Sequence, residues 1–561
     1  MPFRHALVVS LFVSLAACAG LPGEPFDVLI TSGMVYDGSG GEPYVADIAI
    51  KNERIVAIGN YEDAASLLRI DARNLAVAPG FINMLSWAPT SLIEDGRSQG
   101  DIRQGVTLEV FGEGQSYGPL NETMKAAMKA QQVGIKFDIT WTTLGEYLEF
   151  LTNKGISPNV ASFVGATTLR VHEIGFADRP PTSTELSTMR ELTRQAMLEG
   201  ALGLGSSLIY APAFYAETEE LIALAEVVGE YGGMYISHMR SEGNRLLESI
   251  DELIRIARKG GVAAEIYHLK MSGKDNWAKY DEVIAKVAQA RAEGLAITAD
   301  MYTYTAGSTG LDAAMPPWVQ EGGYDAWVER LRDPEIRRKV ASEMSNATDE
   351  WENLMRAAGP DKMLLVGFRD QNLRKYIGKT LAEVATMRGT SAVETAMDLV
   401  IEDGSRVQVV YFLMLEENVR KQVALPWVSF GSDAASMATE GVFLEQSTHP
   451  RAYGNFVRVL GRYVRDEKVL PLETAIYKLT KLPASNLKLR HRGELAPGFY
   501  GDIVIFDPEV VQDHATFDDP HRYATGVVHV FVNGEQVLRD GEHTGALPGQ
   551  VVRGPGWEGW H

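Results

Sequence analysis

Short apolar runs recur along the middle of the chain, and segments with helical periodicity separate most of them. In ETEELIALAEVVGEYG (217–232) and LLESIDELIRIARKGG (246–261), apolar positions return every three or four residues, which is typical of a helix with one buried face. This alternation favours a (β/α)8 barrel over an open doubly wound sheet. The eight predicted strands occupy residues 77–83, 105–114, 159–165, 201–209, 232–238, 261–268, 294–300 and 426–433.

The two ends of the chain have a different pattern, with short alternating strands divided by Gly, Asp and Asn turns. It covers residues 27–59 and 501–542, where Asn533-Gly534 is a hairpin turn. We therefore expect one small β-sandwich domain built from both ends, residues 24–76 and 486–561, with the barrel of residues 77–485 inserted between them. The gap between the last two barrel strands is too long for one βα unit and predicts a helix-rich insertion after strand seven, residues 311–425.

The extreme N-terminus predicts export. Arg4 precedes an apolar run from residue 6 to residue 17, which is too short to span a bilayer and is typical of a signal peptide. Leu15-Ala16-Ala17-Cys18 resembles a bacterial lipobox, so residues 1–18 are expected to be a lipoprotein-type signal with Cys18 lipidated. A plain secretory signal is the alternative. In either case we expect a periplasmic protein, or one anchored in the outer membrane, of a Gram-negative-type bacterium.

Charge and cysteine content exclude some partners and some kinds of site. The net charge of −21 argues against nucleic acid as a partner, because nothing offsets repulsion from phosphates. Cys18 is the only cysteine, so no disulfide and no second thiolate is available for catalysis or metal binding.

Polar residues stand where four of the predicted strands end. Glu113 follows strand two, His238 and His268 end strands five and six, and Asp433 follows strand eight. Catalytic side chains of (β/α)8 barrels lie at these carboxyl ends. Two imidazoles and one carboxylate could form a zinc site with an open position, leaving Asp433 to move protons. Each residue alone also has a structural interpretation: a hydrogen-bonded core histidine, a glutamate in a solvated turn, or a helix N-cap for Asp433.

Longer blocks resemble one family. The sequence is similar to the amidohydrolase superfamily and, within it, to the N-acyl-D-amino-acid deacylases (D-aminoacylases). The similarity covers nearly the whole mature chain, and its blocks are DVLITSGMVYDGSG, VAPGFIN, GALGLGSSLIYAP, YISHMRSEG, IYHLK, DMYTYTAGSTGL, FGSDA, HPRAYGNFVRVLGRYVR and ELAPGFYGDIVIFDP.

The sequence departs from that family at strand one. The family usually has PGFID-x-His-x-His, with both histidines on an α metal, but here Asn83, Leu85 and Trp87 replace the Asp and both His. At strand two, Glu113 stands where many members have a cysteine ligand of the β metal. The resemblance therefore implies one Zn²⁺ per chain, held by Glu113, His238 and His268, with Leu85 and Trp87 lining the pocket.

The same resemblance implies further roles. Asp433 would act as general base and then general acid, and the substrate is expected to be an N-acyl-D-amino acid or a related peptide. A carboxylate of the substrate would meet Lys270, Tyr302 or Tyr304, Tyr210 and Arg451. Two alternatives remain open: a cyclic amidase of the hydantoinase or dihydroorotase type, and a non-catalytic binding lipoprotein on the same fold.

Overall fold

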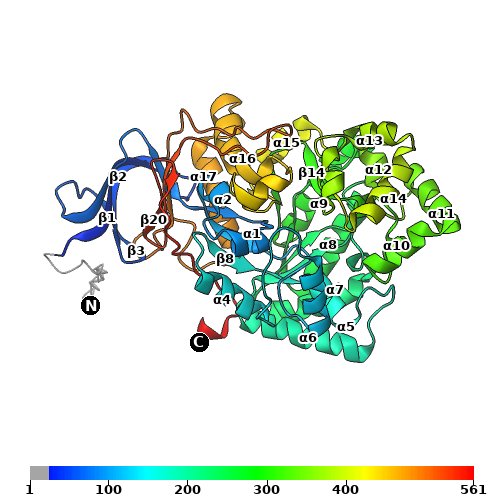
Figure 1. Ribbon diagram of the computed structural model, residues 1–561. Coiled ribbons are helices and arrows are strands. Elements are labelled where there is room, and N and C mark those ends of the chain that lie inside the picture. Colours follow the sequence, from blue (N-terminus) through cyan, green and yellow to red (C-terminus); the bar gives the residue numbers. More distant parts are fainter. Residues whose placement is uncertain (1–23, 561) are drawn as a thin grey trace, which may run out of the picture.

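A β-sheet domain at one end of the molecule is formed by both ends of the chain. The computed structural model describes residues 24–560, so the predicted signal peptide and Cys18 lie outside the described residues. One nine-stranded sheet has the order β21-β20-β19-β18-β5-β1-β2-β3, with β4 beside β1. In Figure 1 the early strands and β20 lie together at the left. The strands are β1 (Phe26–Val35), β2 (Tyr44–Lys51), β3 (Arg54–Gly59), β4 (Ser66–Asp71), β5 (Ala76–Pro79), β18 (Ile503–Phe506), β19 (Val527–Val532), β20 (Glu535–Arg539) and β21 (Glu542–His543).

The central domain is the predicted (β/α)8 barrel. Parallel pairing links β6 to β8 and β9 to β17, and a backbone hydrogen bond from Met84 N to Phe430 O joins the first barrel strand to the last. Each predicted barrel strand has a counterpart in the structure. These are β6 (Phe81–Asn83), β7 (Val106–Phe111), β8 (Asn159–Ser162) with β9 (Val164–Gly165), β10 (Gly203–Ser207), β11 (Met234–His238), β12 (Ala263–Ile266), β13 (Ile297–Met301) and β17 (Val428–Phe430).

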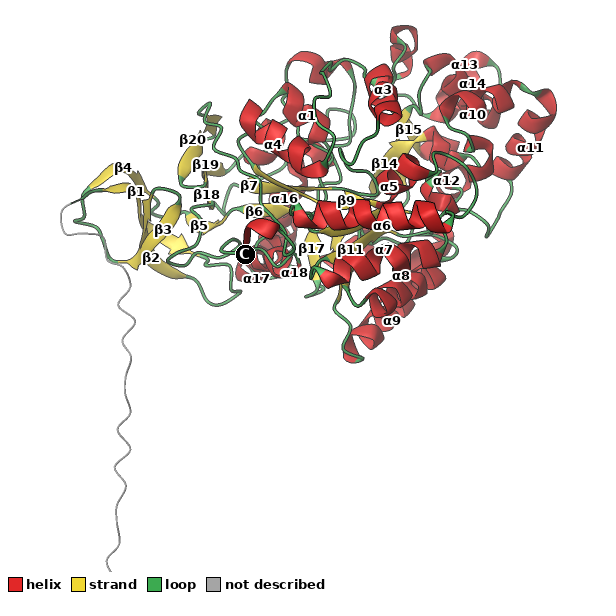
Figure 2. Cartoon of the chain, turned by 90° about the horizontal axis from the view of Figure 1, so that it is seen from below, coloured by secondary structure: helices red, strands yellow, loops and turns green. Residues whose placement is uncertain are grey.

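Helices surround the barrel strands (Figure 2). Capping boxes start two of them, at Thr143 with Glu146 and at Thr182 with Glu185, which satisfies amides that a helix leaves unpaired at its first turn. The barrel helices are α1 (Pro89–Glu94), α2 (Gln99–Ile102), α3 (Glu122–Gln131), α4 (Leu144–Lys154), α5 (Ala166–Glu173), α6 (Ser183–Leu198), α7 (Thr218–Glu230), α8 (Leu246–Gly260), α9 (Tyr280–Ala292), α15 (Glu416–Val423), α16 (Arg451–Arg458), α17 (Leu472–Leu479) and α18 (Lys481–Asn486).

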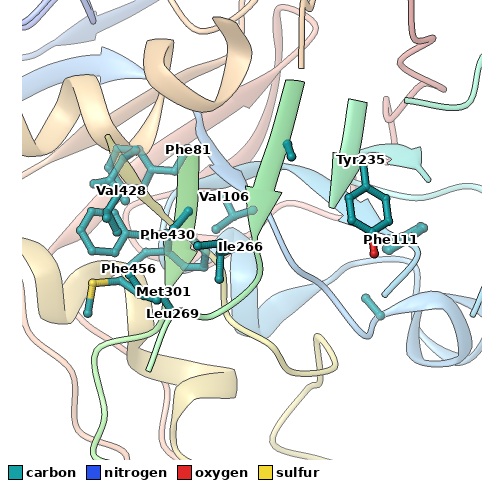
Figure 3. Close-up of a cluster of buried hydrophobic side chains, with 14 of the residues drawn as sticks. Phe81, Val106, Phe111, Tyr235, Ile266, Leu269, Met301, Val428, Phe430 and Phe456 are labelled. Atoms are coloured by element: carbon teal, nitrogen blue, oxygen red, sulfur yellow. The ribbon is translucent and has the colours of Figure 1, made fainter. Parts of the chain in front are cut away.

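The core has an outer layer, between strands and helices, and an inner layer inside the barrel. Phe81, Phe430 and Phe456 belong to the outer layer (Figure 3). Leu85 and Tyr267 belong to the inner layer, where both are fully buried. The alternation of side chains along each strand produces these two layers and leaves the strand ends for polar residues.

The insertion after strand seven has its own apolar core. It is helix-rich, as predicted, with α10 (Tyr324–Arg332), α11 (Pro334–Ser345), α12 (Leu354–Ala358), α13 (Leu381–Arg388) and α14 (Ala392–Asp403). It also contains an antiparallel sheet in the order β14-β16-β15, which the sequence pattern did not predict. Its strands are β14 (Ala306–Gly310), β15 (Met363–Gly367) and β16 (Gln408–Phe412).

The segment after β21 returns to the barrel. It forms isolated parallel bridges from Pro548 to Ile156 and from Val551 to Val160, at the start of the third barrel strand. Among the described residues, no helix is long and apolar enough to cross a membrane.

Candidate metal centre

Three predicted ligands meet at the carboxyl ends of the barrel strands. Glu113 lies two residues after β7, His238 is the last residue of β11, and His268 lies two residues after β12. One ligand atom from each lies within 4.8 Å of the others, and all three residues are buried. The backbone of His268 has a φ of 34°, an uncommon value for a residue with a side chain.

The ligand atoms converge on one carboxylate oxygen. Glu113 Oε1 lies 3.0 Å from His238 Nδ1 and 3.0 Å from His268 Nε2. Burial opposes ionisation of Glu113, but the charges and hydrogen bonds of His268 and His238 hold its pKa well below the usual range. A buried anionic oxygen beside two imidazole nitrogens suits a divalent metal such as zinc, so the residues present fit the implied ion.

Glu242, for which the sequence predicted no role, contacts the histidines on the side opposite Glu113. Its carboxylate lies 3.0 Å from His268 Nδ1 and 3.5 Å from His238 Nε2, the nitrogens that face away from Glu113. Lys270 Nζ donates to Glu242 Oε1 at 2.6 Å. Burial is the largest influence on the pKa of Lys270 and lowers it, but the charges of Glu242 and Tyr302 and the hydrogen bond to Glu242 together outweigh burial, so the net shift is upward. The YISHMRSEG block held the only signal, a glutamate four residues after His238.

Asp433 is connected to Glu113 through the indole N–H of Trp87. Its backbone φ is 49°, and Arg451 Nη1 lies 2.7 Å from its Oδ2. Burial raises the pKa of Asp433, Arg451 lowers it, and Glu113 raises it, so the net shift is upward. Trp87 Nε1 donates to Glu113 Oε2 at 2.8 Å and to Asp433 Oδ1 at 3.1 Å. The residue predicted as an apolar pocket wall therefore also makes polar contacts with both carboxylates.

The remaining predicted residues divide into two groups. Tyr302 is near the site: its ring centroid lies 5.6 Å from Lys270 Nζ and 4.4 Å from the Arg451 guanidinium. The Tyr210 ring lies 5.3 Å from that of His238.

Tyr304 and Leu85 are placed differently from expectation. The Tyr304 hydroxyl donates to Asp513 Oδ2 at 3.4 Å and not to a predicted ligand. Leu85 is 0% exposed and packs inside the barrel, so it does not line an open pocket, which corrects that prediction.

Asn83, which stands where the family usually has an aspartate, belongs to a second buried network. Its Nδ2 donates to Glu109 Oε2 at 3.1 Å and to Ser432 Oγ at 2.8 Å. Burial raises the pKa of Glu109, and burial together with Glu109 raises that of Asp101. The network connects strand one to the loop that carries Asp433.

The insertion approaches the site through Glu352. This carboxylate accepts a hydrogen bond from the backbone N of Glu242. Two pockets of about 180 and 210 Å³ flank this contact, and both are lined by Asn244, Trp351 and Glu352. The insertion thus contacts the loop after strand five, next to the cluster.

A buried cluster of three possible metal ligands at strand ends, with the carboxylate of Asp433 nearby, is typical of a metal-dependent hydrolase on a (β/α)8 barrel. The amidohydrolase family model matches residues 113–538. The chain is 32% identical to a D-aminoacylase of Alcaligenes xylosoxydans xylosoxydans over 535 residues, which is 94% of this chain and 98% of that protein. The chain belongs to the amidohydrolase family.

Solved structures agree with this assignment. A D-aminoacylase structure, from work on one-metal activation and second-metal attenuation of its binuclear center, superposes with a TM-score of 0.79 at 30% identity, over 94% of this chain and 100% of that one. An N-acyl-D-glutamate deacylase from Bordetella bronchiseptica, complexed with zinc and a phosphonate that mimics the tetrahedral intermediate, gives 0.77 at 28% identity over the same shares.

Proposed function

We propose that this protein is a zinc-dependent deacylase of N-acyl-D-amino acids that works with one metal ion. The observation that carries the proposal is the convergence of His238 and His268 on Glu113 Oε1, with Asp433 connected to the same glutamate through Trp87. The deacylases to which the chain is similar support the substrate class. Hydantoinases share only the fold, at 14% identity and a TM-score of 0.52, so the cyclic amidase alternative has weaker support.

Glu113, His238 and His268 would hold the metal. When bound, zinc lowers the pKa of a coordinated water towards about 7 and polarises an amide carbonyl. Asp433 accepts a proton at its carboxylate and returns it to the leaving amine, acting as general base and then general acid. Its raised pKa suits the second step, because a carboxyl with a raised pKa retains a proton more readily.

A group of buried cations suits a substrate carboxylate. Lys270 is 6% exposed and Arg451 is 2% exposed, and both flank the ring of Tyr302. Arg451 Nε has no hydrogen-bond partner among the described residues. A buried guanidinium with a free donor favours an anionic ligand, so we assign the amino-acid carboxylate to this side of the site.

One ion is the expected stoichiometry. Leucine and tryptophan at positions 85 and 87 cannot coordinate zinc. The related D-aminoacylase, which shows one-metal activation and second-metal attenuation, supports catalysis by a single ion.

The test is hydrolysis of matched pairs of N-acetyl-D- and N-acetyl-L-amino acids by the zinc-loaded chain. The released amine measures the rate. We expect turnover of at least one D-substrate and rates at least about tenfold lower for its L-enantiomer, which corresponds to 1.4 kcal/mol of discrimination. Opening of dihydrouracil or hydantoin with no turnover of linear amides would favour the cyclic amidase instead.

We also propose export with a lipid anchor on Cys18, which rests on the sequence pattern of residues 1–18. Labelling cells with a radioactive fatty acid should mark the wild-type protein and leave Cys18→Ser unmarked. Label on both proteins, or on neither, would contradict the anchor.

A further inference from the structure

One indole N–H connects the two carboxylates of the site. Trp87 Nε1 lies 2.8 Å from Glu113 Oε2 and 3.1 Å from Asp433 Oδ1, so a single donor is shared between residues that follow strands two and eight. The backbone around Trp87 is fixed to the same loop, because Trp87 N donates to Ala434 O and Leu85 O accepts from Asp433 N. The indole is therefore held over the site from both its backbone and its ring.

This contact reduces the repulsion between the two carboxylates. Glu113 is buried and 12% of the Asp433 side chain is exposed, and both carboxylates face one donor, so their like charges repel where little water screens them. Two carboxylates in this arrangement need a cation or a hydrogen-bond donor between them. Trp87 supplies the donor and adds no ligand for a metal.

The contact also divides the two oxygens of Glu113 between different partners. Oε2 accepts from Trp87, whereas Oε1 faces His238 Nδ1 and His268 Nε2 at 3.0 Å each. A carboxylate with one oxygen engaged in this way presents a single oxygen to a metal.

We propose that Trp87 is a positioning residue: its indole N–H holds Glu113 as a one-oxygen metal ligand and fixes Asp433 beside it, in the space where a second cation would otherwise bridge the two carboxylates. The inference rests on the proposed function only in taking Asp433 as the proton-transfer group. The part that concerns Glu113 depends on metal binding alone.

The variant W87F removes the N–H and keeps an aromatic ring. W318F is the matched control, because Trp318 Nε1 donates to the carboxylate of Glu343 at 2.9 Å on the insertion, outside the cluster. W87Q restores a donor, since Gln Nε2 lies the same number of bonds from Cα as the indole nitrogen.

Cobalt substitution supplies a readout that needs no substrate. Tetrahedral Co²⁺ absorbs visible light much more strongly than cobalt of higher coordination. We expect wild type, W318F and W87Q to share one intense cobalt spectrum, and W87F to absorb more weakly because Oε2 is freed to bind. With a substrate that the wild type hydrolyses, kcat of W87F should fall about tenfold or more, while KM changes less than about twofold. This pattern is expected when a residue orients a metal ligand and does not bind the substrate itself.

Two results would overturn the proposal. The first is a W87F spectrum equal to those of wild type and W318F. The second is a weak W87Q spectrum, which would show that the ring matters and the N–H does not. The W87Q spectrum tests the role of the N–H even if W87F is unstable. If no amide is hydrolysed by any form but the spectra differ as expected, the deacylase function fails and the role of Trp87 towards Glu113 stands.

Discussion

Glu242 shows how much of this site depends on a residue outside the ligand set. Its carboxylate contacts the outward nitrogens of both histidines and the ammonium of Lys270. Such contacts fix the orientation of a ligating imidazole and increase its basicity. His268 thus lies between two glutamates, Glu113 and Glu242, whereas His238 Nε2 is 3.5 Å from Glu242 and has no hydrogen-bond partner among the described residues.

Replacement of Glu242 by Gln should therefore weaken metal binding. We expect affinity for zinc, measured by competition with a chelator, to fall about 10- to 100-fold. Glu248→Gln is the control, because that side chain is exposed on α8. Equal zinc affinity in E242Q and wild type would show that Glu242 has no influence on the ligands.

Replacement of Asp433 by Asn should separate proton transfer from metal binding. The amide keeps the size of the side chain but cannot accept and return a proton, so kcat should fall by about 10²–10⁴-fold. Zinc content should stay at the wild-type level, because Asp433 is not among the three ligands. Turnover within a few-fold of wild type would remove Asp433 from the mechanism.

At the residue scale, the sequence predicted the members of the site better than their contacts. Strand ends identified Glu113, His238, His268 and Asp433, because the barrel brings these positions together. The role of Glu242 depends on a loop folding back over its own strand, and that of Trp87 on a bond across the barrel mouth. For Glu242 the only sequence signal is its position four residues after His238, and the contact of Trp87 leaves no spacing signal.

At the scale of elements, β12 carries a carboxylate into the inside of the barrel. Glu265 is 0% exposed, accepts hydrogen bonds from Thr298 and Asn486, and has a pKa raised by burial to about 7. A raised pKa means that Glu265 favours folding at low pH and that this contribution is lost as pH rises from about 4.5 to about 7.

Glu265→Gln should consequently stabilise the protein at alkaline pH. The amide keeps an oxygen that can accept from Thr298 and Asn486 and carries no charge to bury. We expect the free energy of unfolding at pH 8 to rise by about 2 kcal/mol, with a gain that shrinks towards pH 5. Urea denaturation at both pH values measures this, with the exposed Glu282→Gln as control; a gain of the same size at pH 5 would contradict the argument.

Elements with local signals were predicted well, and those that need distant partners were not. The barrel strands are bounded by turn residues and followed by amphipathic helices, so their pattern is visible in the sequence. The sheet of the insertion pairs Gly310 with Gln408 and Leu365 with Val409, across long helical segments. Such pairing depends on tertiary structure, which explains why β14, β15 and β16 were missed.

At the scale of the whole molecule, the last residues of the chain connect the sheet domain to the barrel. His543 on β21 faces Ser157 through Nε2 at 3.0 Å, and its Nδ1 accepts from Gly545 N at 2.9 Å. Burial, followed by the charge of Arg97, lowers the pKa of His543 to about 4. This contact therefore needs a neutral imidazole.

Acid should loosen this connection before it affects the barrel. Because the folded pKa of His543 lies below its ordinary value of 6.5, its contribution to stability is present above pH 6.5 and is lost as pH falls towards about 4. His543→Asn keeps an acceptor for Gly545 and cannot titrate. Between pH 7 and pH 5 the melting temperature of wild type should fall, and that of His543→Asn should fall by a few degrees less. Exposed His514→Asn is the control and should show the same fall as wild type. The same fall in His543→Asn would contradict a role for His543.

The most direct test of the account is the metal content of the chain, produced without residues 1–18 and never exposed to added zinc. One buried cluster of three ligands, with Trp87 beside it, predicts close to one equivalent per chain, and His238→Ala should lose it. Absence of metal even after reconstitution, or about two equivalents per chain, would contradict a single working metal site.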